Sequence, residues 1–250
     1  MSLTAHDLRG IQDFYASVLG WEYEPALDGA GSGYSVARAF NGAQVAGLGT
    51  TTETKGLPSV WTAHFVAHSV DVVASRIRER GATVAVGPID FGDGRAVWAA
   101  DPGGASFVAW EGPVNPEWYE RRGQGTCTWL ELRTRDPFAA ALFYGGVFDW
   151  EAQGPEQLDV RYQHDRVVLW IAGRAVAGLY GGGVQAAPDQ HLRPQWHVYF
   201  SVGDVDEAAL RAEKAHGTVV TAPQDTPFGR AAGIRDPEGG LFHVIADQQG

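Results

Sequence analysis

The chain has 250 residues, of which 44% are hydrophobic and 20% charged, and its formal net charge is −11. This composition is typical of a globular protein with room for two domains of ordinary size. The acidic balance argues against nucleic acid or an anionic membrane as a partner, because either needs a basic surface. The one cysteine, Cys127, excludes an internal disulfide. Since there is also no secretory pattern or long apolar run, we expect a cytoplasmic protein.

The chain contains two copies of one pattern, residues 1–114 and 127–250, joined by a turn-rich stretch over 115–126 that we interpret as a linker. The motifs occur in the same order in both copies, which chance similarity does not explain. The matched stretches are Asp7–Trp21 with Asp136–Trp150, Gln44–Leu48 with Ala175–Leu179, and Gly94–Pro102 with Gly229–Pro237.

Short strands and helices alternate in the same order in both copies. The first copy predicts helices over 8–19 and 71–80, which are followed by glycines of the kind that end helices, Gly20 and Gly81. The second copy starts with a predicted strand over 127–134.

A helix is expected directly after that strand. Asp136 is placed to cap its N-terminus, and Pro137 suits its first turn. Its buried side is predicted from an apolar stripe made of Phe138, Ala141, Leu142 and Val147.

The rest of the second copy predicts seven further strands and one helix. The helix starts at Asp204 or Asp206 and is closed by Gly217. The repeated unit is a strand, a helix and three strands, and it occurs four times, which predicts an α+β fold. The strands are expected over 158–163, 166–172, 175–179, 196–202, 218–221, 231–234 and 241–246, with a turn at Gly173-Arg174.

The motifs over 136–150, 196–206 and 236–243 resemble the vicinal oxygen chelate (VOC) superfamily, which includes glyoxalase I, bleomycin-resistance proteins and extradiol dioxygenases. The resemblance covers nearly the whole chain and is strongest to actinobacterial tandem-domain proteins labelled hydroxylase or glyoxalase-like. It implies two VOC domains, 1–114 and 127–250, each built of paired βαβββ modules that form a cupped mixed sheet. Fold-level analogy alone does not give the activity.

The resemblance also indicates where a metal would bind. In metal-using members the ligands lie on the first strand, at the equivalent place in the second half, and after the Asp-Pro-x-Gly turn. The second copy carries Trp129, His197 and His243 there. The first copy carries Thr62 and Val108 at the last two of these positions, so the first domain is not expected to hold metal.

Strand alternation adds polar residues to the expected second cup, because residues two apart share a face. This set is Trp129, Glu131, Arg133, His197, Tyr199, Ser201 and His243. Imidazoles, a carboxylate, a phenol and a guanidinium beside an indole are more than a packed core accommodates without partners. The purely structural alternative is an internal ion pair of Glu131 with Arg133 or a histidine.

Two chemistries fit these residues. His197, His243 and Glu131 are a possible ligand set for iron or zinc, although Glu131 is displaced by two residues, roughly 6–7 Å, from the family position. In the other, His197 and His243 act as acid and base, with Glu131 as base or orienting carboxylate. Tyr199 and Arg133 then stabilise oxyanion charge.

The tryptophans predict the kind of ligand. Four of them, Trp21, Trp61, Trp150 and Trp196, match between the copies and are expected to be structural. The unmatched ones favour a flat aromatic ligand. His64 shares the cup-facing side of its strand and, with Ser201, is expected to contact the ligand. The unmatched tryptophans are Trp98, Trp110, Trp118, Trp129 and Trp170.

The sequence therefore favours an enzyme of small-molecule, secondary metabolism that acts on an aromatic or polyketide-like substrate. The reaction is either acid–base chemistry, such as cyclisation, dehydration or isomerisation, or metal-assisted oxygenation. The alternative is a non-catalytic antibiotic-binding protein of the bleomycin-resistance type. Either protein is expected to be a monomer or a homodimer.

Overall fold

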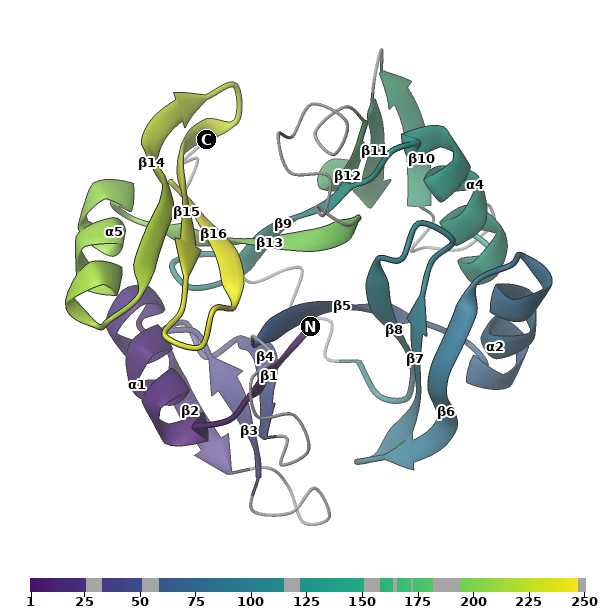
Figure 1. The fold of residues 1–250 in the computed structure, drawn as a ribbon, viewed down its shortest axis with the longest axis horizontal. Helices are drawn as coiled ribbons and strands as arrows, with labels where there is room; N and C mark the ends of the chain where they lie inside the picture. The colour runs from purple at the N-terminus through teal and green to yellow at the C-terminus, as the bar shows by residue number, and fades with distance from the viewer. Residues whose placement is uncertain are drawn as a thin grey trace. The chain divides into compact units, whose positions relative to one another are not determined.

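The computed structural model describes residues 1–25, 33–50, 59–114, 122–150, 158–163, 166–171, 173–181 and 194–246. The predicted order of strand, helix and three strands is found in all four modules (Figure 1). The first copy contains β1 (Ser2–Ala5), α1 (Leu8–Leu19), β2 (Glu22–Pro25), β3 (Tyr34–Arg38), β4 (Gln44–Thr50), β5 (Val60–Val66), α2 (Val70–Glu79), β6 (Thr83–Phe91), β7 (Gly94–Ala100) and β8 (Ser106–Glu111). The second contains β9 (Cys127–Arg133), α4 (Pro137–Phe148), β10 (Leu158–Gln163), β11 (Arg166–Ile171), β12 (Arg174–Tyr180), β13 (Gln195–Val202), α5 (Val205–Lys214), β14 (Thr218–Thr226), β15 (Gly229–Arg235) and β16 (Leu241–Ala246).

Each copy carries a mixed sheet of eight strands, so the α+β fold is confirmed. The strand orders are β2-β3-β4-β1-β5-β8-β7-β6 and β10-β11-β12-β9-β13-β16-β15-β14. The first strand of each module pairs in parallel with the last strand of the same module, while the three later strands pair antiparallel. No helix in the described part of the chain is long and apolar enough to cross a bilayer.

Contacts group the four modules differently from the two sequence copies. Unit 1 comprises Met1–Trp61, Asn115–Thr128 and Val198–Gly250, and unit 2 comprises Thr62–Val114 and Trp129–His197. Each unit therefore takes one module from each copy. Helices α1 and α5 pack together in unit 1, and α2 and α4 pack together in unit 2 (Figure 1).

The helix boundaries follow the local signals. The Asp7 side chain accepts a hydrogen bond from the Gly10 N–H at the start of α1, and Gly20 ends that helix with φ of 74°. Asp136 caps α4 as predicted, accepting from the N–H groups of Phe138 and Ala139 at 3.0 and 2.9 Å.

The predicted buried stripe of α4 is wrong in part. Phe138 and Leu142 are 42% and 72% exposed. Ala141 and Val147 are buried as predicted, and the remaining buried positions include Ala140, Phe143 and Tyr144. Because nearly every residue of this helix is apolar, the sequence pattern did not single out the face that the two aromatic rings occupy.

The end of α5 also differs from the prediction. The helix stops at Lys214, and His216 rather than Gly217 adopts the left-handed conformation, with φ of 66°. Gly217 is needed for a different reason, since a Cβ there would lie 2.7 Å from Cε2 of Phe14. The glycine lets the two modules of unit 1 approach closely.

A chain of three buried polar groups crosses the core of unit 1. Trp61 Nε1 donates to the Tyr15 hydroxyl at 2.8 Å, and that hydroxyl donates to Asp236 Oδ2 at 3.0 Å. Burial, reinforced by Asp236, raises the pKa of Tyr15 well above its ordinary value, so the phenol keeps its proton and remains a donor. The Gly240 N–H and the Glu238 N–H donate to the other oxygen of Asp236.

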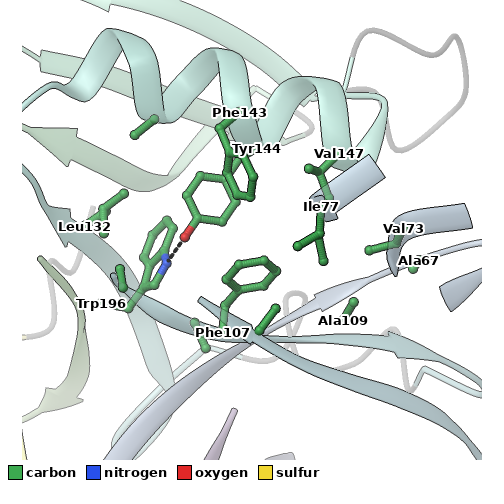
Figure 2. Packing of buried hydrophobic residues seen from close by; sticks show 14 of the residues in the cluster. Ala67, Val73, Ile77, Phe107, Ala109, Leu132, Phe143, Tyr144, Val147 and Trp196 are labelled. Carbon is green, nitrogen blue, oxygen red and sulfur yellow. Dashed lines mark hydrogen bonds between the residues drawn. The ribbon is translucent and has the colours of Figure 1, made fainter. Parts of the chain in front are cut away.

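Unit 2 has the same three groups, but here the tryptophan and tyrosine come from the second copy and the aspartate from the first. Trp196 Nε1 donates to the Tyr144 hydroxyl at 2.9 Å, and Tyr144 donates to Asp101 at 3.1 Å. Figure 2 shows the Trp196–Tyr144 hydrogen bond inside the apolar cluster, with Phe107 and Ile77 beside it. The predicted structural role of Trp61 and Trp196 is confirmed, because each indole N–H donates a hydrogen bond inside a core.

Removing either hydroxyl should destabilise the protein. Tyr15→Phe or Tyr144→Phe leaves a buried indole N–H and a buried carboxylate each without one partner, at a cost of about 1–3 kcal/mol. Urea unfolding measures the loss, and Tyr162→Phe, whose ring is exposed, is the matched control. An unfolding midpoint unchanged from wild type would contradict the role assigned to this chain of hydrogen bonds.

The buried aspartates also predict a pH effect. Burial raises the pKa of Asp236 above its usual 3.8, although Gly240 and Tyr15 donate to it. The folded state therefore holds this proton more tightly than the unfolded chain does. The resulting stabilisation is complete below about pH 3.8 and is lost as pH rises through the raised pKa. The unfolding free energy of wild type minus that of Asp236→Asn should fall as pH rises above about 3.8, whereas a constant or rising difference would contradict the assignment.

Candidate functional site

One side of the β9–β12 sheet in unit 2 is unusually polar. Its other side, with Leu132, Leu169 and Leu179, belongs to the apolar cluster of the unit. The alternate residues therefore face away from the core. We call this surface the polar face; its residues are Trp129, Glu131, Arg133, Asp159, Arg161, Arg166, Val168, Trp170, Gly178 and Tyr180.

Strand register arranges these residues in rows. One row runs from Arg161 through Val168 and Gly178 to Glu131, with one residue from each of four neighbouring strands. The next row contains Arg166, Tyr180 and Arg133. Small residues thus occupy the middle of the first row, with charged side chains at both of its ends.

Glu131 and Arg133 form the ion pair that the structural alternative anticipated. Arg133 Nε lies 2.7 Å from Glu131 Oε1, and the Glu131 side chain is only 14% exposed while Arg133 remains more open. Arg133 therefore holds an almost buried carboxylate in a fixed orientation. This geometry suits a hydrogen-bond acceptor or base for a ligand as well as it suits a structural pair.

Four polar members of this face were not predicted from the sequence: Asp159, Arg161, Arg166 and Tyr180. The Arg161 guanidinium lies 4.2 Å over the ring of Trp170, and its Nε donates to Asp159 at 2.8 Å. Arg166 donates to the Tyr180 hydroxyl at 3.3 Å. Alternation along β10, β11 and β12 was the available signal, but placing these strands on a common face needs the register between them.

Trp129 lies over the backbone of β12. A Cβ on Gly178 would lie 2.6 Å from Cζ2 of Trp129 and 2.5 Å from Cε2 of Tyr180. Glycine at this position allows the indole to cross the strand closely.

His197 lies on β13 within unit 2 and is 5% exposed. Its Nε2 is 3.2 Å from the side-chain nitrogen of Gln195. This contact holds the ring against the side chain two residues before it on β13. Neighbouring Trp196 points to the opposite side, into the apolar cluster.

Tyr199 and His243 meet in unit 1. They are register partners on the parallel strands β13 and β16, and their rings stack with centroids 4.4 Å apart and planes within 16°. His243 is 8% exposed. Ser201, two residues beyond Tyr199, is buried, and its Oγ has no hydrogen-bond partner among the described residues.

The corresponding positions of the first copy are less polar. Ser2 and Thr4 pair with β4 where Glu131 and Arg133 pair with β12. His64 pairs with Val108, at the place where Tyr199 pairs with His243. Burial lowers the pKa of His64 well below its ordinary value, so this imidazole is neutral.

Trp110 shares the face of His64, since it pairs with Val66 two residues along β5. Trp98 pairs with Val108 on the same side, and Phe91 packs edge-on against both Trp98 and Trp110. The first copy therefore presents an aromatic surface without the Glu131–Arg133 pair. Trp118 lies outside the described residues.

The predicted metal ligands do not form a site in the described residues. No three His, Cys, Asp or Glu side chains there lie close enough together to hold a metal ion. Within the described residues, Glu131, His197 and His243 therefore do not fit an iron or zinc ion, and the chemistry below is assigned to the side chains themselves.

The close approach of Trp129 and Gly178 gives a direct test. Gly178→Ala should lower the free energy of unfolding by about 1–3 kcal/mol, because the new methyl group overlaps Trp129 and Tyr180. Gly203→Ala is the matched control, since a Cβ there meets nothing within 4 Å. Equal stability of the two variants in urea unfolding would contradict the packing described.

Comparison with known proteins identifies the family. The model of the Glyoxalase/Bleomycin resistance protein/Dioxygenase superfamily matches residues 1–108 and 126–244. A putative glyoxylase of Mycobacterium tuberculosis is 32% identical, covering 98% of this chain and 92% of the relative. The anthracycline biosynthesis protein DnrV of Streptomyces peucetius is also 32% identical, covering 99% and 92%.

Solved structures agree on the fold. The Mn(II)-bound glyoxalase of Novosphingobium aromaticivorans is 16% identical with a TM-score of 0.57, covering 98% of this chain and 80% of its own. A homoprotocatechuate 2,3-dioxygenase variant of B. fuscum is 16% identical with a TM-score of 0.60, covering 98% and 69%. With the repeated βαβββ modules and two eight-stranded sheets, the chain belongs to the glyoxalase, bleomycin-resistance and dioxygenase superfamily, the VOC superfamily.

Proposed function

We propose that this chain is an enzyme of secondary metabolism that acts on an aromatic, polyketide-like substrate by acid–base chemistry. The relative from Streptomyces peucetius, which matches over nearly its whole length, is named for anthracycline biosynthesis. Anthracyclines are fused aromatic compounds, and the indoles of the polar face suit a ligand of that kind. Cyclisation, dehydration and isomerisation of such compounds all require proton transfer at carbon or oxygen.

The stacked pair of Tyr199 and His243 is the observation that carries this proposal. An imidazole titrates near neutral pH and exchanges protons readily. Parallel stacking at 4.4 Å brings the imidazole and the phenol together, so that both groups can act on one small ligand. In the proposed reaction His243 removes a proton from the substrate, and the Tyr199 hydroxyl donates a hydrogen bond to the oxygen that gains charge.

The polar residues of unit 2 support the same kind of chemistry. Glu131 supplies a carboxylate fixed by Arg133, and His197 supplies a second imidazole. We assign Glu131 to orienting the substrate or accepting its proton, and Arg133 to stabilising negative charge. We assign ligand contact alone to the remaining residues, which are Ser201, Trp129, Trp170, His64 and Trp110.

We prefer acid–base chemistry to metal-assisted oxygenation because of how the potential metal ligands are arranged. The described residues contain no group of three that could hold a metal ion. The paired groups at 131–133 and 199–243 have geometries that proton transfer can use without such an ion.

Substituting His243 is the direct test. His243→Ala should lower turnover by at least about 100-fold, the usual contribution of a general acid or base, while unfolding stays cooperative. Product formation from a panel of anthracycline aglycones and their precursors is followed by mass spectrometry. His68→Ala, an exposed histidine at a strand end, is the matched control and should keep full turnover.

Tyr199→Phe separates the two roles in the pair, because it keeps the stacked ring and removes the hydroxyl. We expect a loss of about tenfold or more in kcat. Unchanged turnover in His243→Ala would overturn the assignment. Tight binding of a panel compound with no product from the wild-type protein would instead identify the sequestering, bleomycin-resistance-like alternative.

A further inference from the structure

We propose that the polar face of unit 2 recognises a carboxylate carried by the aromatic ligand, and that Arg161 and the indole N–H of Trp170 are its donors. The proposal rests on the proposed function only in taking an aromatic small molecule as the ligand. Beyond the proposed function, it states that the ligand is negatively charged and names the residues that recognise the charge.

Arg161 is held in place but not saturated. Asp159 engages its Nε at 2.8 Å, and the ring of Trp170 supports its guanidinium plane at 4.2 Å. Within the described part of the chain, neither of its Nη nitrogens has an acceptor. A guanidinium that is held in place and has two Nη donors without an acceptor matches the two oxygens of a carboxylate.

Trp170 provides the second donor. Its Nε1 is buried and has no hydrogen-bond partner among the described residues. Buried N–H groups in folded proteins are nearly always satisfied, so this unmatched donor indicates an acceptor that a bound ligand supplies. The donor belongs to the same side chain over which Arg161 lies.

The charge of this surface favours an anion. Arg133 and Arg166 share the polar face with Arg161, so that three guanidiniums stand against the two carboxylates of Asp159 and Glu131. The chain as a whole carries a net charge of −11. A local excess of positive charge on an acidic protein attracts anionic ligands to that place.

The row from Arg161 to Glu131 sets the size of the ligand. These residues lie on strands three positions apart, which is about 14 Å at the usual strand spacing. Val168 and Gly178 lie between them, and the Trp129 ring over Gly178 offers the aromatic ligand a stacking surface. Two or three fused rings fit this length with a carboxylate at the Arg161 end.

Titration of the full chain with 2-naphthoate and its neutral analogue 2-naphthamide tests the proposal. We expect the wild-type protein to bind 2-naphthoate at least tenfold more tightly. Arg161→Gln should reduce that preference to within about twofold and leave the affinity for 2-naphthamide unchanged. Arg78→Gln, on the exposed side of α2, is the matched control and should keep the wild-type preference.

Trp170→Phe provides an independent arm, because it keeps a ring beneath Arg161 and removes only the N–H. It should weaken 2-naphthoate binding severalfold more than 2-naphthamide binding, and circular dichroism and urea unfolding check that each variant is folded. Equal wild-type affinities for the two compounds, or a preference that survives Arg161→Gln, would overturn the proposal. These titrations involve no turnover, so their failure leaves the His243→Ala assay standing, and the reverse also holds.

Discussion

The buried hydrogen-bond chain from tryptophan through tyrosine to aspartate is the constraint on which both units depend. A phenol inside an apolar core needs an acceptor, and in unit 1 Asp236 provides it to Tyr15. That carboxylate is in turn fixed by backbone N–H groups of the Asp-Pro-x-Gly turn. The hydrogen bond between Tyr15 and Asp236 therefore connects the first helix of one copy to a turn of the other copy. It also fixes the positions of the strands that flank this helix and this turn.

The repeat made most of the fold predictable. Local signals such as Asp136 and Gly20 act within a few residues, so the sequence located most helix ends and the strands of the second copy to within two residues. The exceptions are the end of α5 and β14, which runs to Thr226 and not to 221. The buried face of α4 was not predictable, because a helix that is apolar all round carries no periodic signal. The grouping of modules across the copies was equally hidden, since the partner of Tyr15 lies 221 residues away.

The candidate site was likewise predictable only in part. Alternation along single strands predicted that Glu131 and Arg133 share a face, and they pair. Arg161 was missed because its meeting with Trp170 depends on the register between β10 and β11. The register then shifts between Leu169 and Trp170 where β11 meets β12, so a count from the turn at Gly173 would misplace the row. Long-range pairing, which no short pattern encodes, decides which side chains a ligand would meet together.

The exchange of partners between the copies limits what one copy can do alone. Tyr15 and Trp61 come from the first copy and their aspartate from the second, while Tyr144 and Trp196 come from the second and their aspartate from the first. Neither copy alone can satisfy its own phenol. A half-length chain that kept this arrangement would have to borrow the carboxylate from an identical neighbour, so the repeat unit of this architecture is a reciprocal pair of copies. The two copies are not equivalent in charge, since only the second carries an ion pair on its first strand.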